Sequence, residues 1–255
     1  MKVVLDLGKS AQENAAVYYQ KAKKLREKAA GAERAVEESR RETGEVKKKP
    51  AVRRKRQWYE KFHWFISSDG FLVIGGRDAE QNEVIFSKYL ESSDVFLHAD
   101  VHGAPAVVVK NGSTAPERTL MEAAQFAASY SNGWKEGMAS VDVYAVSKEQ
   151  VSKYSHGEYV PKGGFVITGD RKWFKNVELK LYVGVSESGL ECVPALCGKS
   201  RFLACAGIVP GEGEKSDLSR KLFELLLKKI EGERVNWKEE DIARFLPPGG
   251  GKVVE

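Results

Sequence analysis

Alanine and larger apolar side chains recur every three or four positions along residues 15 to 36, and this spacing constrains the segment to a helix. The repeat has the a and d spacing of a coiled coil and consists of Ala15, Tyr18, Ala22, Leu25, Ala29, Ala32 and Val36. Ser10 and Glu13 form a capping-box pattern at its start, and Pro50 lies beyond its end. A helix from Ser10 to about Glu42 would be about 45–50 Å long at 1.5 Å per residue.

The positive charge of the chain is concentrated in the same region. Residues 1 to 62 contain 18 lysines and arginines against 9 aspartates and glutamates, a net charge of +9, whereas the remaining residues contain 23 against 27. Seven of the ten residues from Lys47 to Arg56 are basic, and a return helix over about 51 to 63 would complete a basic hairpin. A polyanion would therefore meet this arm first, and a solvated helix face is the alternative interpretation.

Helix and strand patterns alternate irregularly beyond residue 62, which favours an α+β domain over a doubly wound sheet. The patterns predict strands over residues 71–74, 141–146, 164–168, 177–186 and 191–194. They predict helices from Asp78 to about Leu90, from a capping box at Thr119 and Glu122 through Trp134, over 217–231, and from Asn236. We therefore expect a coiled-coil arm over residues 1–62 and a mixed β-sheet domain with packed helices over residues 63–255.

Composition excludes several classes of protein. The three cysteines, Cys192, Cys197 and Cys205, lack CxxC spacing, so we expect neither a disulfide framework nor a structural zinc site. No apolar run approaches the roughly 20 residues of a membrane span. The N-terminus is too short and too soon acidic for a signal peptide. We expect a cytoplasmic protein without a membrane partner.

His98, Asp100 and His102 form the densest group of potential ligands in the sequence. If residues 94 to 102 are one strand, the three side chains project from one face. Together with Gly103 they would form a polar recognition or structural site, and we expect no tightly bound metal. The alternative is a metal-dependent hydrolase or nuclease, although no second carboxylate cluster completes such a site.

Several segments are similar to the NFACT-R domain of the NFACT family, which contains the nuclear-export-mediator-factor and fibronectin-binding protein A-like proteins. They are residues 57–83, 100–104, 108–111, 119–124, 128–134, 151–159, 163–169 and 246–250. Residues 3 to 45 resemble the coiled-coil segment of the same family. The resemblance therefore covers nearly the whole chain.

The resemblance implies a role in ribosome-associated quality control. Members of the family bind large ribosomal subunits obstructed by peptidyl-tRNA and recruit tRNA. This chain is thus expected to be a non-enzymatic RNA-binding module that contacts large-subunit rRNA, tRNA or both, with no cofactor. The N-terminal domain and helix-hairpin-helix region that hold tRNA in the family do not occur in this sequence. A partner chain or those domains would therefore have to supply tRNA recruitment.

Basic and aromatic residues supply the candidate RNA contacts. Those that could bind the RNA backbone are Arg53, Arg54, Lys55, Arg56, Arg77, Lys110, Lys162, Arg171, Lys172 and Lys175. Trp173 could stack on an unpaired base, with core packing as the alternative. A third hypothesis is a protein-interaction scaffold in which the arm binds another coiled coil. The charge of the arm favours RNA, because a scaffold has no need of it.

Overall fold

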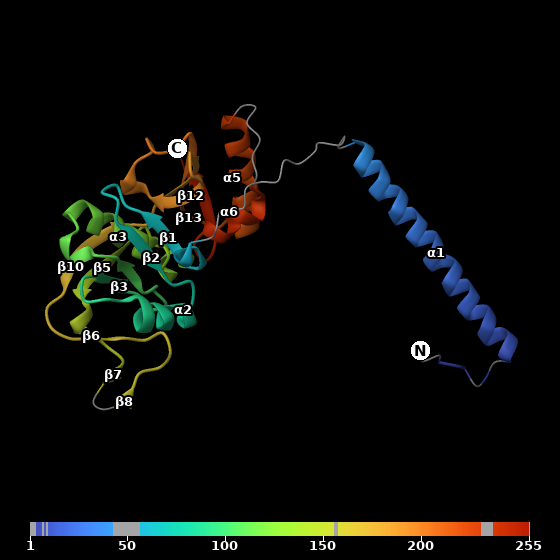
Figure 1. The fold of residues 1–255 in the computed structure, drawn as a ribbon, viewed down its shortest axis with the longest axis horizontal. Helices are drawn as coiled ribbons and strands as arrows, with labels where there is room; N and C mark the ends of the chain where they lie inside the picture. The colour runs from blue at the N-terminus through green and yellow to red at the C-terminus, as the bar shows by residue number, and fades with distance from the viewer. Residues whose placement is uncertain are drawn as a thin grey trace. The chain divides into compact units, whose positions relative to one another are not determined.

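The computed structural model describes residues 4–6, 8, 10–42, 57–155, 158–230 and 237–254. The chain forms two compact units, Met1–Lys55 and Arg56–Glu255, both drawn in Figure 1. The basic run Arg53–Arg56 and most of the expected return helix lie outside the described residues. In the described part of that segment, the 3-10 helix η1 (Trp58–Lys61) is followed directly by a strand. The return helix therefore does not continue through residue 63.

The predicted helical arm is confirmed as α1 (Ala11–Glu42). Its capping box is also confirmed, because the Ser10 amide donates to Glu13 Oε2 at 2.8 Å and the Glu13 amide donates to Ser10 Oγ at 3.3 Å. These two bonds satisfy amides that the first turn of a helix leaves without partners. Leu25, the largest aliphatic residue of the seam, is 67% exposed. Within the described residues of its unit, the seam is thus uncovered at this position.

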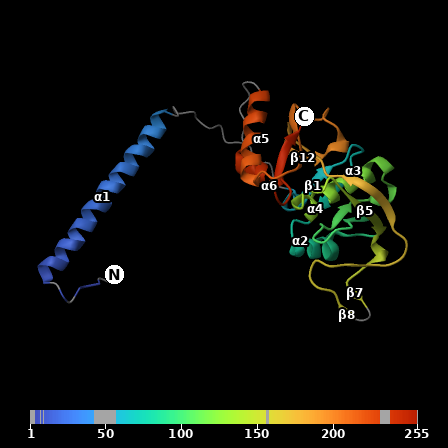
Figure 2. The same cartoon turned by 180° about the vertical axis from the view of Figure 1, so that it is seen from behind.

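A six-stranded antiparallel sheet forms the centre of the second unit. In spatial order its strands are β1 (His63–Ile66), β2 (Leu72–Gly75), β4 (Val107–Val109), β3 (Val95–Ala99), β5 (Ser140–Ser147) and β10 (Lys172–Glu178). Helix α3 (Glu117–Ser129) packs on one face, and α2 (Ala79–Val84) with the π-helical turn η2 (Ile85–Tyr89) packs toward the other (Figures 1 and 2). Each face of the sheet consequently has its own apolar core.

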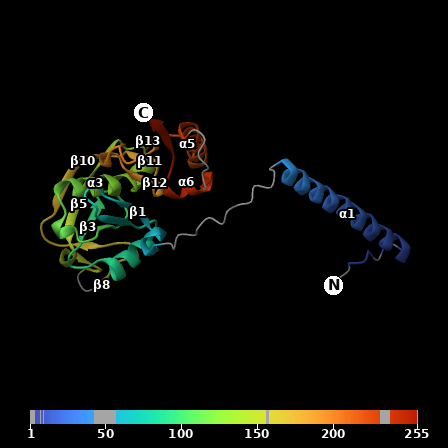
Figure 3. The same ribbon diagram turned by 45° about the horizontal axis from the view of Figure 1, so that its top comes forward.

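A four-stranded antiparallel sheet lies beside the first. Its strands, in spatial order, are β12 (Gly189–Pro194), β11 (Leu181–Ser186), β13 (Ala204–Pro210) and β14 (Gly251–Val254). Helices α5 (Lys215–Lys229) and α6 (Glu239–Phe245) pack against this sheet (Figure 3). Leu222 and Ile242 on these helices are completely buried. Their core is continuous with the core beneath α3, because α3 lies between the two sheets.

Shorter elements connect the two sheets and the helices. They are β6 (Val151–Ser152) paired with β9 (Val166–Ile167), β7 (Tyr154–Ser155) paired with β8 (Glu158–Tyr159), α4 (Asn132–Lys135), η3 (Gly112–Thr114), η4 (Lys148–Gln150) and η5 (Ala195–Cys197). Trp134 in α4 donates from Nε1 to the carbonyl of Gly250 at 2.7 Å, which ties the C-terminal segment to α4. No helix in the described ranges is both long and apolar enough to span a membrane.

The expected α+β class is confirmed, and all strand pairs between described residues are antiparallel. The strand expected over 177–186 is wrong as a single element. Residues 172–178 end the six-stranded sheet, and 181–186 belong to the four-stranded one. The chain changes sheets after a bulge between Phe174 and Val177, where Asn176 has a positive φ of 51°.

The predicted start of the helix at Thr119 is also wrong. Helix α3 begins at Glu117, after Pro116, instead of at a capping box of Thr119 and Glu122. Both of these residues are buried, and their side chains form hydrogen bonds with the β1–β2 turn. Thr119 Oγ1 donates to Asp69 Oδ2 at 2.7 Å, and Glu122 Oε2 accepts from the amide of Ser68 at 2.9 Å. The sequence pattern of Thr119 and Glu122 resembles a local helix cap, but the two side chains instead make tertiary contacts with the β1–β2 turn.

The end of this helix differs from the prediction as well. Helix α3 stops at Ser129, and α4 is a separate turn because Ser131 Oγ accepts from the amide of Gly133 at 3.1 Å. The expected cap Asn236 lies outside the described residues. Helix α6 begins at Glu239.

Candidate nucleic-acid interface

The edge strand β10 carries an aromatic and cationic cluster, which we call the β10 surface and define as Tyr144, Arg171, Trp173 and Lys175. Trp173 is 38% exposed. Arg171 Cζ lies 4.7 Å from the centre of the Tyr144 ring, and Lys175 Nζ lies 4.1 Å from the centre of the Trp173 ring. The two rings meet edge to face at 5.5 Å. Such cation–π contacts orient positive charge beside an exposed ring.

The strand register explains why these aromatic side chains lie together. Trp173 on β10 is paired with Tyr144 on β5, and Tyr144 is paired in turn with His98 on β3. Residues opposite one another on neighbouring strands lie on the same face of a sheet. His98, Tyr144 and Trp173 therefore form one row across three strands. Tyr144 is 7% exposed and supports the row, while Trp173 remains open to a ligand.

The lysines of β10 are held by ion pairs that water can reach. Lys175 Nζ lies 2.8 Å from Asp142 Oδ2, and Lys172 pairs with Glu117. The two lysine side chains are 58% and 49% exposed. The hydrogen bond from Lys175 lowers the pKa of Asp142. Because exposed ion pairs contribute little to stability, these lysines can exchange a carboxylate for a phosphate at small cost.

Two other predicted RNA contacts have different surroundings. Lys110 Nζ lies 2.6 Å from Asp94 Oδ2 and donates to the carbonyl of Tyr89 at 2.8 Å, and its side chain is only 16% exposed. The ammonium group therefore already has partners within the fold, and its role as an RNA backbone contact stays a prediction. Lys162 is 59% exposed and pairs with Glu80 at 2.7 Å.

The structure does not gather His98, Asp100 and His102 on one strand face. Strand β3 ends at Ala99, and the chain then bends, so only His98 of the three has a strand position. His98 is partly buried, whereas Asp100 and His102 are exposed. Burial lowers the pKa of His98. Among the described residues, no group of three or more histidines, cysteines and carboxylates is placed to hold a metal ion.

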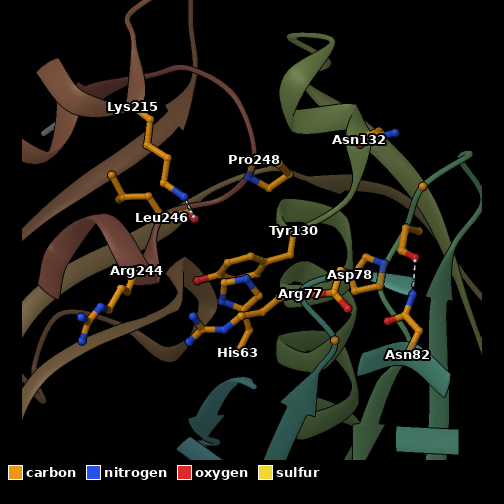
Figure 4. A pocket seen from close by; sticks show the side chains of 14 residues that line it. His63, Arg77, Asp78, Asn82, Tyr130, Asn132, Lys215, Arg244, Leu246 and Pro248 are labelled. Atoms are coloured by element: carbon orange, nitrogen blue, oxygen red, sulfur yellow. Dashed lines mark hydrogen bonds between the residues drawn. The ribbon is translucent and has the colours of Figure 1, made fainter. Parts of the chain in front are cut away.

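A pocket of about 320 Å³ lies where loops of the six-stranded sheet meet α5, α6 and the C-terminal segment (Figure 4). We call it the cationic pocket. Its lining residues are His63, Gly76, Arg77, Asp78, Asn82, Gly103, Ala104, Pro105, Tyr130, Asn132, Lys215, Arg244, Leu246 and Pro248. Arg77 and Gly103 were predicted as site residues from the sequence. The remaining polar groups of the pocket were not assigned to a site.

Positive charge dominates the cationic pocket. Arg77 Nη2 donates to the carbonyl of Phe62 at 3.2 Å, and Lys215 Nζ donates to the carbonyl of Leu246 at 2.9 Å. Neither cation forms an ion pair within the part of the chain that the structure describes. Loss of surrounding water lowers the pKa of Arg77 and of Lys215. The charge of Arg244 lowers the pKa of Arg77 further, and the charge of Arg77 lowers that of Lys215.

His63 lies at the centre of this charge. Its ring is 4.1 Å from the ring of Tyr130, centre to centre, and Figure 4 shows the two rings overlapping beside Arg77. The buried Nδ1 atom of His63 has no hydrogen-bond partner in the described structure. Burial lowers the pKa of His63 well below its ordinary value, and Arg77 and Lys215 lower it further. His63 is therefore neutral at pH 7.

Two glycines bring the backbone close to polar side chains in the wall of the pocket. Gly103 has a φ of +74°, and a Cβ atom there would lie 2.2 Å from Asn132 Nδ2. A Cβ atom on Gly76 would lie 2.1 Å from Asn82 Oδ1, which accepts from the amide of Ala106 at 2.9 Å. Neither position has room for a side chain, so the glycines allow this part of the wall to close.

The fold and these two sites define an α+β domain with a cationic, partly aromatic edge and a separate cationic pocket. Residues 61–169 match the family described as the NFACT protein RNA binding domain. The archaeal Rqc2 homolog aRqcH of Methanocaldococcus jannaschii is 39% identical over 220 residues, which cover 84% of this chain and 32% of that protein. The chain belongs to the NFACT family, as its sequence motifs indicated.

Other relatives give the same family. The human ribosome quality control complex subunit NEMF is 40% identical over 176 residues, covering 64% of this chain and 16% of that protein. The chain spans about a third or less of the length of these curated relatives. A solved structure of the C-terminal part of the fibronectin/fibrinogen-binding protein from Streptococcus suis is similar at 18% identity with a TM-score of 0.41, covering 66% of this chain and 76% of that chain.

Proposed function

We propose that this chain is a non-enzymatic RNA-binding module of a ribosome-associated quality-control factor. Two lines of evidence support it: the matched family is described as RNA-binding, and the relatives are named as ribosome quality control proteins. In this role the module contacts large-subunit rRNA, tRNA or both at stalled peptidyl-tRNA complexes in the cytoplasm. A partner chain or further N-terminal domains supply tRNA recruitment.

The observation that carries the proposal is the exposed Trp173 between Arg171 and Lys175 on an edge strand. Unpaired RNA bases stack on aromatic side chains, and nearby cations neutralise the adjoining phosphates. The β10 surface offers both within one short segment. Strand β10 has a neighbour on one side only within the described sheet, so a single strand of RNA has access to it.

The hydrolase alternative is less well supported by this geometry. It required His98, Asp100 and His102 on one strand face, and the strand ends before Asp100. The exposed Leu25 on α1 supports the scaffold alternative. Binding of a second coiled coil would be compatible with RNA binding by the other unit, because the two features lie in different units.

The proposal is tested by measuring the affinity of the full chain for a short single-stranded RNA with hydroxyl groups at both ends. Trp173→Ala should weaken binding about tenfold, because stacking on one base contributes roughly 1–3 kcal/mol. Trp58→Ala is the matched control, since Trp58 is 44% exposed but one face of its ring is stacked on Tyr89 at 4.7 Å. Equal losses in both variants, or none in Trp173→Ala, would remove the β10 surface as the binding site.

A second measurement addresses the ribosome. Large ribosomal subunits carrying peptidyl-tRNA should sediment with the wild-type chain, and less of the Trp173→Ala variant should sediment with them. Arg171→Gln and Lys175→Gln should each reduce binding more at low salt than at high salt, because phosphate contacts are screened by ions. A wild-type chain that sediments alone would contradict the ribosomal part of the proposal.

A further inference from the structure

The cationic pocket contains a buried His63 nitrogen without a hydrogen-bond partner in the described structure and two cations without ion pairs among the described residues, and none of these groups belongs to the β10 surface. We propose that it binds a phosphomonoester, carried by a mononucleotide or by the phosphorylated end of an RNA strand. The inference rests on the proposed function only for naming RNA as the carrier. The pocket and the β10 surface are built from different residues, so each can be tested without the other.

Charge is the first argument for a phosphomonoester. Arg77 and Lys215 bring two positive charges to the pocket, and Arg244 adds a third on α6. Among the described residues that line the pocket, the one acidic residue is Asp78, which caps α2 by accepting from the amide of Gln81 at 2.8 Å. A phosphomonoester carries a charge of about −1.5 to −2 at pH 7, whereas a phosphodiester within a strand carries about −1. The terminal group therefore balances the two cations more completely.

Arg244 differs from the other two cations of the pocket. Its Nη1 atom lies 3.4 Å from Asp241 Oδ1, and its side chain is 62% exposed. This weak pair leaves Arg244 free to turn toward a ligand. Arg77 and Lys215 are the better probes of the pocket, because they form no ion pair with a described residue.

The unpartnered nitrogen of His63 is the second argument. A buried polar atom without a partner is unfavourable, and such atoms are rare in folded proteins. A phosphate oxygen would accept a hydrogen bond from His63 Nδ1 in the tautomer protonated there. The ring is held in place by its contact with the ring of Tyr130, whose hydroxyl donates to the carbonyl of Phe245 at 2.5 Å.

The size and walls of the pocket select the kind of ligand. Its volume of about 320 Å³ is at the lower end of the range for small-molecule sites, roughly 300–1,000 Å³. A nucleotide matches this size, whereas a duplex does not. The walls come from β1, from two loops of the six-stranded sheet, from the end of α3 and from α5 and α6. Because the pocket is enclosed from several sides, an RNA strand can enter it most readily by one of its ends.

The first test uses inorganic phosphate and the imidazole resonances of His63 in the full chain. Phosphate should shift these resonances in a saturable manner, and sodium chloride at equal ionic strength should not. Lys215→Gln should weaken phosphate binding roughly tenfold or more, the loss expected for one charge-assisted hydrogen bond. Arg220→Gln on the same helix is the matched control, because Arg220 is 60% exposed and pairs with Asp217.

The second test identifies the carrier. One short RNA is compared in three forms, with a 5′-phosphate, with a 3′-phosphate and with hydroxyl groups at both ends, and adenosine monophosphate is used as a competitor. A phosphorylated form should bind more tightly than the hydroxyl form, and Lys215→Gln should abolish the difference. If adenosine monophosphate binds but no phosphorylated end is preferred, the carrier is a free nucleotide.

Two results together would overturn the inference. If phosphate leaves His63 unchanged, and Lys215→Gln behaves like Arg220→Gln with all three RNAs, the pocket does not bind phosphate. Failure of the proposed function is a different result, in which the hydroxyl-ended RNA does not bind the wild-type chain. In that case a saturable phosphate shift at His63 would still establish the pocket.

Discussion

His63 on β1 and Tyr130 at the end of α3 pack against one another with their ring centres 4.1 Å apart and their planes tilted by 32°, although they are far apart in the sequence. The contact joins the six-stranded sheet to the helix that packs against both sheets. It also places an imidazole next to Arg77 and Lys215, so that the ionisation of His63 reports on the whole pocket.

Acidification should destabilise the protein through His63. Its pKa is depressed in the folded state, whereas in the unfolded chain it is about 6.5. Below pH 6.5 the unfolded state therefore binds a proton that the folded state excludes, and the free energy of unfolding falls until the folded pKa is reached. Thermal unfolding at pH 7 and pH 5 should show a smaller shift in His63→Gln than in the wild type.

Lys215→Gln should raise the pKa of His63 by removing a repelling charge, which histidine resonances can follow directly. A pKa of His63 near 6.5 in the wild-type protein would contradict this account of the pocket.

The buried ion pair of Lys110 should contribute to stability. Asp94 is completely buried at its side chain and accepts from Lys110 and from the amide of Asn111 at 2.8 Å. Asp94→Asn leaves Lys110 without its main partner, and breaking a buried pair costs roughly 3–5 kcal/mol, less here because Lys110 is 16% exposed. Urea unfolding should show this decrease in the free energy of unfolding. Glu80→Gln, which removes an exposed pair, should leave the transition nearly unchanged.

Gly103→Ala should destabilise the protein and perturb the cationic pocket. The substitution combines an unfavourable positive φ with a Cβ atom 2.2 Å from Asn132 Nδ2. Gly137→Ala is the matched control, because Gly137 has a φ of +72° and open space around the added Cβ atom. Gly137→Ala should cost about 1 kcal/mol from backbone strain alone. A Gly103→Ala variant as stable as Gly137→Ala would show that Asn132 moves aside freely.

The basic run before the domain should set the salt dependence of RNA binding. Replacing Arg53, Arg54, Lys55 and Arg56 with glutamine removes up to four phosphate contacts. The slope of log K against log salt should then become shallower by up to about 3–4 units. The four positions lie outside the described residues, so this expectation comes from the sequence. An unchanged slope would assign the electrostatic contact to the folded domain.

Elements with a clear local period could be predicted from the sequence. Helix α1 and helix α5 have apolar residues at helical spacing, and Leu218, Leu222 and Leu226 of α5 are buried as that spacing requires. The start of α3 could not be predicted in this way. The hydroxyl and carboxylate of its apparent capping box bind a turn on a different element, and no local pattern encodes that choice.

The candidate sites show the same limit. Arg171, Trp173 and Lys175 are close in the sequence, so their cluster could be predicted, but Tyr144 joined it only through strand pairing. The cationic pocket could not be predicted, because His63 and Lys215 meet only when the two sheets pack. Arg77 and Gly103 were predicted as site residues, but in separate groups, Arg77 as an RNA backbone contact and Gly103 with His98, Asp100 and His102.

The hydrogen bond between Trp134 and the Gly250 carbonyl joins an earlier part of the chain to a later one, which determines when the pocket can form during synthesis. Every strand of the six-stranded sheet precedes residue 179, whereas the pocket also requires Lys215, Leu246 and Pro248. A nascent chain therefore has all strands of the large sheet before the ligand site exists. The site can be assembled only after residues 246–248 have left the ribosome, so its occupancy shows that both sheets have packed together.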